Sequence, residues 1–134
     1  MERVRLGVVG CGVMGNRHLA AAADCPLLDV AAVADLIQER SQAAAKQFGV
    51  AKAYGPGSEL IADGDVDAVV FATVAADRNE LAIEALKAGK HVLVEKPVAI
   101  SADECRAMIK AGKEADRLLM VAQVLRFGVE GQTL

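Results

Sequence analysis

Short, unbroken runs of apolar residues recur along the chain and are separated by longer stretches rich in alanine and charged residues. The runs at residues 68–72 and 118–122 do not alternate between apolar and polar positions. An unbroken run indicates a strand covered on both faces, as in a parallel sheet with helices on each side. The pattern predicts strands at residues 4–9, 28–34, 51–54, 67–73, 91–94 and 118–123.

Helices are predicted between these strands. The segment at 102–115 is preceded by Ser101 and carries Glu104 three residues later, which is the pattern of a capping box. The segment at 77–88 is followed by Gly89, where a C-terminal cap is expected. The predicted helices are 14–23, 38–48, 77–88 and 102–115, with a shorter helical turn at 58–62.

The strand–helix–strand rhythm predicts one domain over residues 1–134. Alternating strands and helices build an α/β fold, here a Rossmann-type, doubly wound parallel sheet with right-handed crossovers.

A glycine-rich segment, GCGVMG at residues 10–15, follows the first predicted strand and opens the first predicted helix. In such a loop Gly10 permits a tight turn, Gly12 lets a pyrophosphate approach the backbone, and Gly15 lets helix and strand pack closely. The helix N-terminus then offers unpaired N–H groups to the phosphates. The segment lacks the lysine of a P-loop, which excludes that class. Taken alone, the motif also fits a glycine-rich turn without a ligand.

The second predicted strand ends at Asp35, twenty residues after Gly15. An acidic side chain at this place hydrogen-bonds the adenosine ribose hydroxyls and repels a 2′-phosphate. Leu36 and Ile37 supply no arginine to hold that phosphate, although Arg40 lies one helical turn further on. NAD is therefore favoured over NADP. Two alternatives stay open here: Asp35 can serve as a helix N-cap, and methyltransferases share a glycine-rich loop and an acidic strand end.

The segment AGKHVLVEKP at residues 88–97 is the most informative stretch. Its strand delivers Glu95, Lys96 and Pro97 to the carboxyl end of the sheet, where ligands bind in open α/β sheets. Pro97 ends the strand and restricts Lys96 to an extended or turn conformation. A fixed lysine there can donate to a substrate oxygen or, if partial burial lowers its pKa, shuttle a proton. Taken alone, the tripeptide also fits a solvated Glu–Lys pair in a loop.

Composition limits the partners of the chain. Of its 134 residues, 54% are hydrophobic and 25% charged, with a net charge of −3 and a pI near 5.4. No block of Lys or Arg would hold a nucleic acid or an anionic membrane, and no apolar run approaches the roughly 18 residues of a membrane span. Three cysteines without C-x-x-C spacing indicate a reducing cytoplasm rather than a disulfide framework or a metal site. We therefore expect a cytoplasmic protein with no metal, nucleic-acid or membrane partner.

Together these motifs resemble the N-terminal domain of the Gfo/Idh/MocA oxidoreductases, the glucose–fructose oxidoreductase and inositol dehydrogenase family. The resemblance covers nearly the whole chain, through segments 6–15, 33–35, 85–92, 95–97 and 121–127. Residues 88–97 are specific to this family and remove the methyltransferase alternative. The resemblance implies an NAD(P)-dependent oxidoreductase that moves a hydride between nicotinamide and a hydroxyl or carbonyl carbon of a sugar, nucleotide sugar or polyol.

The resemblance also implies roles for individual residues. Lys96 would be the catalytic lysine that assists proton transfer, with Glu95 beside it near the nicotinamide ribose, and the Lys96–Pro97 bond is often cis in the family. Gln123 and Arg126 match positions at the edge of the active site. The implied dinucleotide contacts are Gly10, Gly12, Val13 and Met14 for the pyrophosphate, Asp35 for the adenosine ribose, and Thr73, Ala75, Glu95, Lys96 and Gln123 for the nicotinamide side.

Two departures from the family pattern bear on function. The usual Thr-Pro-Asn-x-x-His after the fourth strand reads TVAADR at residues 73–78, so Val74, Ala75 and Arg78 replace proline, asparagine and histidine. An amide contact to the cofactor is lost, and a cation stands where an imidazole is expected. The family's C-terminal domain, which supplies the substrate pocket and the oligomer interface, is absent from these 134 residues.

We therefore expect a cofactor half-site that binds NAD(H) without turnover, because hydride transfer needs both partners held near contact distance. A sugar or polyol substrate would bind only with a second domain, and exposed apolar surface can support a homo-oligomer. The alternative is a stand-alone dinucleotide-binding module with a regulatory or docking role and no catalysis.

The remaining candidates receive structural interpretations. His18, in the first helix, fits a packed or half-exposed position better than a cofactor contact. His91 is interpreted as structural, and Cys11 as a small residue beside the pyrophosphate rather than a nucleophile. Met108 and Met120 lie on apolar faces and are predicted to be core residues.

Overall fold

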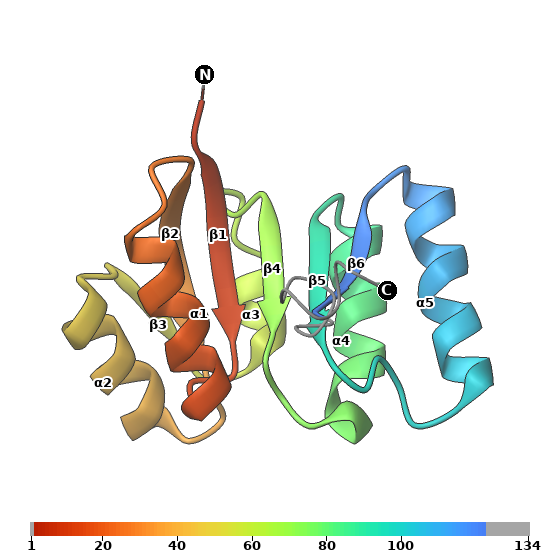
Figure 1. Ribbon diagram of the computed structural model, residues 1–134, viewed down its shortest axis with the longest axis horizontal. Coiled ribbons are helices and arrows are strands. Elements are labelled where there is room, and N and C mark those ends of the chain that lie inside the picture. Colours follow the sequence, from red (N-terminus) through yellow and green to blue (C-terminus); the bar gives the residue numbers. More distant parts are fainter. Residues whose placement is uncertain (1, 123–134) are drawn as a thin grey trace, which may run out of the picture.

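The computed structural model describes residues 2–122, which form a six-stranded parallel sheet and five helices (Figure 1). The strands are β1 (Val4–Val9), β2 (Leu28–Ala34), β3 (Lys52–Tyr54), β4 (Ala68–Phe71), β5 (His91–Glu95) and β6 (Leu119–Ala122). The helices are α1 (Val13–Ala23), α2 (Gln38–Phe48), α3 (Gly57–Ile61), α4 (Ala75–Lys87) and α5 (Ala102–Ala115). One helix joins each strand to the next, as the sequence pattern predicts.

The order of the strands in the sheet is β3-β2-β1-β4-β5-β6, and all the pairings are parallel. The chain builds outward from β1 to β3 and then returns to place β4 beside β1. The loops after β1 and β4 therefore leave the sheet toward opposite faces, which opens a crevice at this switch point. The carboxyl ends of the strands lie along the lower edge of the sheet in Figure 1. The predicted doubly wound Rossmann-type sheet is confirmed.

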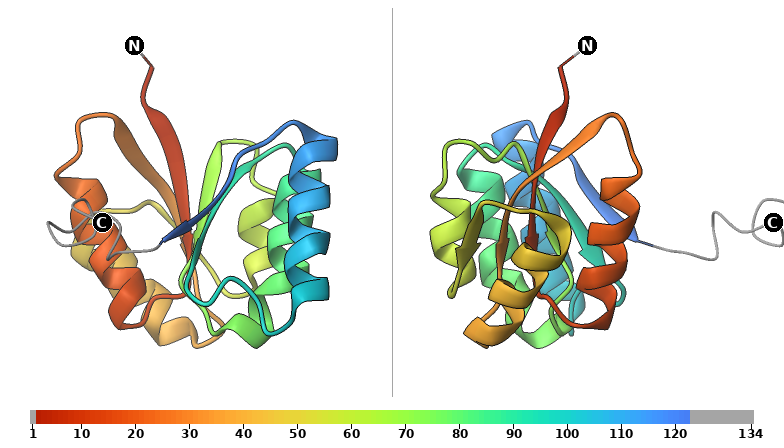
Figure 2. Two further views of the ribbon diagram at one scale, coloured as in Figure 1. Left: turned by 45° about the vertical axis from the view of Figure 1, so that its right-hand side comes forward. Right: turned by 90° about the vertical axis from the view of Figure 1, so that its left-hand side faces the viewer.

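Helices cover both faces of the sheet. Figure 2 shows α1 and α2 on one face and α3, α4 and α5 on the other. Buried apolar side chains form two matching clusters, one including Val8, Leu19 and Ala44, and the other including Leu86 and Met108. Successive strand residues point alternately into these two cores, which is why the strands read as unbroken apolar runs. None of the helices within residues 2–122 is long and apolar enough to cross a membrane.

The edge strand β6 departs from this pattern. Met108 is fully buried, as predicted, but Met120 is 52% exposed, so its predicted place in the core is wrong. β6 pairs with β5 on one side, and Leu119 and Val121 pack against the α5-side core. Met120 alternates with them and therefore points to the opposite face. A short apolar run alone does not distinguish an edge strand from a central one.

Local sequence signals set several helix ends. At the start of α5 the Glu104 N–H donates to Ser101 Oγ at 3.2 Å, which confirms the N-cap. The Glu104 carboxylate accepts from the N–H of Ile100 rather than that of Ser101. Gly89, which follows the C-cap residue Ala88 of α4, has the left-handed φ of +84° that favours glycine. The largest differences from the predicted bounds lie between β4 and α4, where the strand ends and the helix starts two residues earlier than expected.

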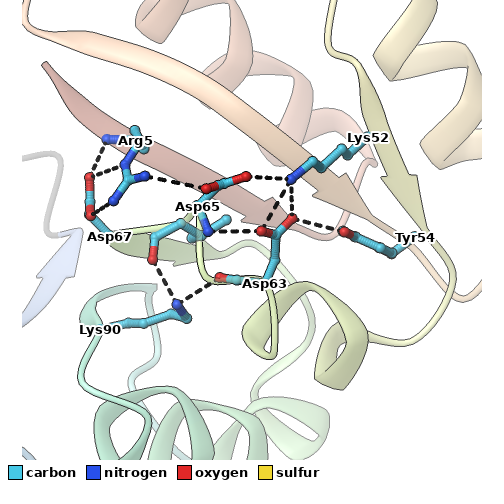
Figure 3. Close-up of polar contacts among 8 residues, drawn as sticks. Arg5, Lys52, Tyr54, Asp63, Asp65, Asp67 and Lys90 are labelled. Carbon is cyan, nitrogen blue, oxygen red and sulfur yellow. Dashed lines mark hydrogen bonds and ion pairs between the residues drawn. The ribbon is translucent and has the colours of Figure 1, made fainter.

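A network of charged side chains closes the amino edge of the sheet, opposite the crevice (Figure 3). The Arg5 guanidinium donates to both carboxylate oxygens of Asp67. The Lys52 ammonium donates to Asp63 at 2.9 Å and to Asp65 at 3.0 Å. These contacts join the start of β1 and of β3 to the segment that leads into β4.

The same contacts hold two carboxyl groups in the charged form. The Arg5 guanidinium and the Arg5 N–H lower the pKa of Asp67 to about 2. Hydrogen bonds from the Asp65 N–H, from the Lys52 ammonium and from a tyrosine hydroxyl lower the pKa of Asp63 to about 2. Carboxylates that accept several hydrogen bonds are harder to protonate.

Two further side chains complete the network. The hydroxyl of Tyr54 donates to Asp63 Oδ2 at 2.8 Å. Lys90 is buried and donates to the carbonyl oxygens of Asp63 and Val66 at 2.9 and 2.7 Å. Burial lowers the pKa of Lys90. This lysine, although part of the segment at residues 88–97, is therefore structural and lies away from the crevice.

Candidate dinucleotide-binding site

The loop after β1 uses its three glycines in three different ways. Gly10 has φ +98°, and a Cβ there would lie 2.9 Å from the backbone of Ala72. A Cβ on Gly15 would lie 1.7 Å from the carbonyl oxygen of Gly10, so α1 packs on the loop with no room for a methyl group. A Cβ on Gly12, in contrast, would meet no atom of residues 2–122 within 4 Å. Gly12 thus borders open space, as the approach of a pyrophosphate requires.

The N-terminus of α1 faces the same open space. Gly12 is its N-cap residue and has no side chain to accept from the first-turn N–H groups, which a helix leaves without internal partners. Val13 is 72% exposed and Met14 is partly exposed. The unpaired N–H groups and the positive end of the helix dipole can hold an anion here.

Asp35 joins the glycine-rich loop to the loop after β2. Its Oδ2 accepts from the N–H of Cys11 and its Oδ1 from the N–H of Ile37, each at 2.8 Å. The carboxylate is therefore held at the end of β2, where the sequence predicts a ribose contact. Ile37 is the N-cap residue of α2. The alternative that Asp35 caps this helix is thus wrong.

Cys11 is buried beneath this loop, with its Sγ 3.5 Å from the carbonyl oxygen of Ala34. Burial and the neighbouring Asp35 carboxylate raise the pKa of Cys11 to about 11. The thiol is therefore a poor nucleophile, in agreement with its interpretation as a small packing residue. Within residues 2–122 no three His, Cys, Asp or Glu side chains converge on a metal site.

A pocket of about 850 Å³ runs along the carboxyl edge of the sheet. This volume lies within the range of small-molecule and cofactor sites. Its walls come from the loops after β1, β2 and β4, from the turn before α3 and from the first turns of α2, α3 and α4, and include Gly10, Gly12, Asp35, Arg40, Ser58 and Thr73. Glu95 and Lys96 lie outside this set. The pocket wall therefore contains four of the predicted contacts, namely Gly10, Gly12, Asp35 and Thr73.

Two buried polar atoms in the pocket wall test whether a dinucleotide fits. Thr73 Oγ1 and Asn79 Oδ1 are buried without a hydrogen-bond partner among residues 2–122. Such atoms cost free energy unless something supplies a partner. A dinucleotide carries ribose hydroxyls and amide groups that can do so. With the open face of Gly12 and the fixed carboxylate of Asp35, the residues present fit this ligand.

Two of the predicted nicotinamide-side residues, Glu95 and Lys96, lie at the carboxyl end of β5. Lys96 follows the strand directly, is exposed, and precedes a cis peptide bond to Pro97. Glu95, the last residue of β5, is buried, and its Oε1 lies 2.5 Å from Nε2 of His18 on α1. His18 is partly buried, as predicted, but its carboxylate partner is new. Because β5 lies on the far side of β4 from β1, this group faces the second half of the crevice.

Arg78 corrects the expectation drawn from the altered 73–78 segment. Its side chain is 2% exposed, and its guanidinium donates to the carbonyl oxygens of Thr73, Glu95 and Pro97. Burial lowers the pKa of Arg78. The cation is therefore not offered to the pocket. It ties the loop after β4 to the loop after β5.

The other predicted residues are placed as follows. Ala75 is the first residue of α4 and lies between two residues of the pocket wall, Val74 and Ala76. His91 accepts from the N–H of Leu118 through Nδ1, which agrees with a structural role. Gln123 and Arg126 lie outside the described residues.

Sequence reasoning missed the contacts of His18 and Arg78. For Arg78 a signal existed, because it stands four residues before Ala82 and seven before Ala85 on the buried stripe of α4. A charged residue on such a stripe needs buried acceptors. For His18 no local signal existed, since Glu95 is 77 residues away in the sequence.

Comparison with known protein families shows which family this chain belongs to. The family described as an oxidoreductase family with an NAD-binding Rossmann fold matches residues 4–123. This chain belongs to the Gfo/Idh/MocA oxidoreductase family. The resemblance drawn from the sequence motifs is thereby confirmed.

Three members of the family are close in sequence or structure. Inositol 2-dehydrogenase of Salmonella typhimurium is 33% identical over 127 residues, which cover 92% of this chain and 38% of that enzyme. KijD10, a 3-ketoreductase from Actinomadura kijaniata solved with TDP-benzene and NADP, matches with a TM-score of 0.92 and 29% identity, over 98% of this chain and 42% of that one. The WlbA dehydrogenase from Bordetella pertussis, solved with NADH and UDP-GlcNAcA, matches with a TM-score of 0.92 and 32% identity, over 98% and 40%.

The chain spans about two-fifths of the length of these Gfo/Idh/MocA relatives. The matched part is their dinucleotide-binding Rossmann domain. One of the two solved relatives was solved with NADP and the other with NADH.

Proposed function

We propose that this chain is the dinucleotide-binding domain of an NAD-preferring oxidoreductase that acts on a hydroxyl or carbonyl carbon of a sugar, nucleotide sugar or polyol. The observation that carries the proposal is the open face of Gly12 beside the fixed carboxylate of Asp35. The names and bound molecules of the family members support the substrate class.

A bound nicotinamide would supply the carbon that accepts or delivers the hydride. In the proposed complex the backbone of Gly10, Gly12, Val13 and Met14 holds the pyrophosphate, and Asp35 accepts from the adenosine ribose hydroxyls. Thr73 and Ala75 border the path to the second half of the crevice, where Glu95 and Gln123 complete the nicotinamide side.

Lys96 is the proposed catalytic residue. Its exposed position at the carboxyl end of β5 leaves its ammonium free to reach a substrate held above the sheet edge. There Nζ would hydrogen-bond the reacting oxygen and take or return its proton as the hydride moves. Because the chain spans only part of its relatives, nucleotide binding is the step for which it can be tested directly.

The preference for NAD rests on the hydrogen bonds of Asp35. Both of its carboxylate oxygens are held by backbone N–H groups, so the negative charge cannot swing away from a 2′-phosphate. Arg40 lines the same pocket and is the cation that would oppose this repulsion. The Asp35 carboxylate is fixed by two backbone N–H groups, whereas Arg40 is an exposed side chain on α2, which favours NAD.

Titration calorimetry with NADH and NADPH tests both statements. We expect NADH to bind at least about tenfold more tightly than NADPH, a difference of about 1.4 kcal/mol. Asp35→Ala should weaken the binding of NADH and reduce the difference in affinity between NADH and NADPH. Asp29→Ala, an exposed position on the same strand at the opposite edge of the sheet, is the matched control and should change neither affinity. Equal affinities would contradict the NAD preference, and binding of neither nucleotide would contradict the proposed function.

The alternative, a binding module without catalysis, is favoured by one observation. Lys96 lies outside the set of described residues that line the pocket, so nucleotide binding there does not require it. The reading frame discriminates between the two functions. A coding sequence that continues past Leu134 supports the enzyme, whereas a stop codon there supports the module.

A further inference from the structure

One helix reaches both halves of the crevice. The N-terminus of α1 faces the open space beside Gly12, where the pyrophosphate is proposed to bind. Further along the same helix, His18 contacts Glu95 at the end of β5. The strand order places β5 beyond β4, on the side of the switch point away from Asp35. A dinucleotide spans such a switch point, one half on each side.

The contact between His18 and Glu95 joins a partly buried side chain to a buried one. Nε2 of His18 and Oε1 of Glu95 are 2.5 Å apart, and their side chains are 22% and 9% exposed. This distance is that of a hydrogen bond, and an ionised carboxylate can only accept, so Nε2–H of the imidazole is the donor to the Glu95 carboxylate. With little water present, the carboxylate depends on this donor more than an exposed group would.

Glu95 is held from both faces of the sheet. His18 on α1 holds its side chain, while Arg78 on α4 donates to its carbonyl oxygen and to that of Pro97. Lys96, between Glu95 and Pro97, is exposed and depends on these neighbours for the position of its backbone. Among residues 2–122, the strand end that carries the lysine is therefore hydrogen-bonded to α1 through the side-chain contact of His18 with Glu95.

We propose that His18 is a positioning residue for the nicotinamide half of the site. It orients Glu95, and through it the backbone of Lys96, relative to the helix that receives the pyrophosphate. The inference rests on the proposed function and adds a residue that does not line the pocket. Its consequence is that loss of His18 weakens binding of the nicotinamide half and spares the adenosine half.

Two ligands separate these halves. ADP tests the adenosine and pyrophosphate contacts, and NADH tests these together with the nicotinamide side. We expect His18→Leu to lower the affinity for NADH about tenfold and to leave the affinity for ADP unchanged. A loss of this size is the effect of one hydrogen bond to a charged group. His18→Gln, whose amide can place an N–H near the position of Nε2, should restore most of the NADH affinity. His91→Leu removes the other histidine, at the opposite end of the same strand, and should alter neither ligand.

A double-mutant cycle tests whether His18 acts through Glu95. If it does, His18→Leu should have no further effect on NADH in a Glu95→Ala background. If the losses of NADH affinity in His18→Leu and Glu95→Ala add in the double variant, the inference is overturned. An equal loss of affinity for ADP and for NADH in His18→Leu would also overturn it, because it would indicate a purely structural role. Unchanged NADH affinity in His18→Leu would overturn it as well, while leaving the proposed function intact. Failure of the unaltered chain to bind either ligand would instead overturn the proposed function, and this inference with it.

Discussion

The two edges of the sheet differ in whether their polar side-chain atoms have hydrogen-bond partners. At the amino edge the carboxylates of Asp63 and Asp67 accept several hydrogen bonds each, and the buried ammonium of Lys90 has two carbonyl acceptors. At the carboxyl edge, four buried side-chain atoms have no partner among residues 2–122. They are Asn16 Oδ1, Thr73 Oγ1, Arg78 Nε and Asn79 Oδ1. The polar side chains at the amino edge therefore pair with one another, whereas the carboxyl edge has unpaired atoms, two of them on Thr73 and Asn79 in the pocket wall.

The largest effects are expected from two substitutions in the glycine-rich loop, one of which should lower stability and the other NADH binding. Gly15→Ala should destabilise the fold by about 3 kcal/mol, because the new methyl group overlaps the carbonyl of Gly10 and the loop must shift. Gly12→Ala should leave stability within about 1 kcal/mol, because no described atom obstructs the methyl group. The same methyl group should abolish measurable NADH binding. Urea unfolding and calorimetry on the two variants provide the measurements.

Gly64→Ala is the control for this pair. Gly64 lies near the amino edge and, like Gly12, has no atom of residues 2–122 within 4 Å of an added Cβ. It should change neither stability nor NADH affinity appreciably. If Gly12→Ala still bound NADH normally, its open face would not be where the pyrophosphate lies.

A smaller effect should appear at the amino edge in acid. The pKa values of Asp63 and Asp67 are lowered to about 2 from 3.8. Their contribution to stability is therefore complete above the ordinary carboxyl pKa and is lost as the pH falls from about 4 towards 2. Urea midpoints measured across this range should decline, and Asp67→Asn should make the decline shallower. A decline of the same steepness in that variant would show that other groups cause it.

The smallest effects are expected from removing one hydroxyl group at each edge. The hydroxyl at the carboxyl edge has no hydrogen-bond partner among residues 2–122, and the one at the amino edge has a partner. Thr73→Val removes the unpaired Oγ1 at the carboxyl edge and should leave stability unchanged or raise it by up to about 1 kcal/mol, while weakening NADH several-fold. Tyr54→Phe removes the hydroxyl that donates to Asp63 at the amino edge, and should cost about 1 kcal/mol of stability without affecting NADH. A loss of stability in Thr73→Val would mean that its hydroxyl already has a partner.

The sequence predicted the features of the fold that depend on neighbouring residues. Unbroken apolar runs predicted the parallel sheet, since strands covered on both faces have no polar side. The glycine spacing predicted the loop, because each of its positions is limited by backbone conformation or close packing. Even the acidic residue directly after β2, Asp35, followed from the pattern. What stayed open was whether Asp35 is the N-cap of α2, and the structure places Ile37 at that position instead.

The contacts that the sequence could not predict are those between distant segments. The pairs of His18 with Glu95 and of Arg5 with Asp67 join residues far apart in the chain, and nothing in their neighbours indicates them. Met120 was assigned to the core because its run resembles that of a central strand, whereas its exposure depends on where β6 lies in the sheet. Strand order is a property of the assembled fold and leaves little mark on any single run.

The buried thiol beneath the glycine-rich loop has a practical consequence for labelling. Maleimide and iodoacetamide dyes react with thiolates, and Cys11 is both enclosed and, with its pKa raised to about 11, almost wholly protonated at neutral pH. Cys25 and Cys105 are partly exposed and lie on other segments of the chain. A fluorescent reporter can therefore be attached at either of them while the loop that faces the nucleotide keeps its native chemistry.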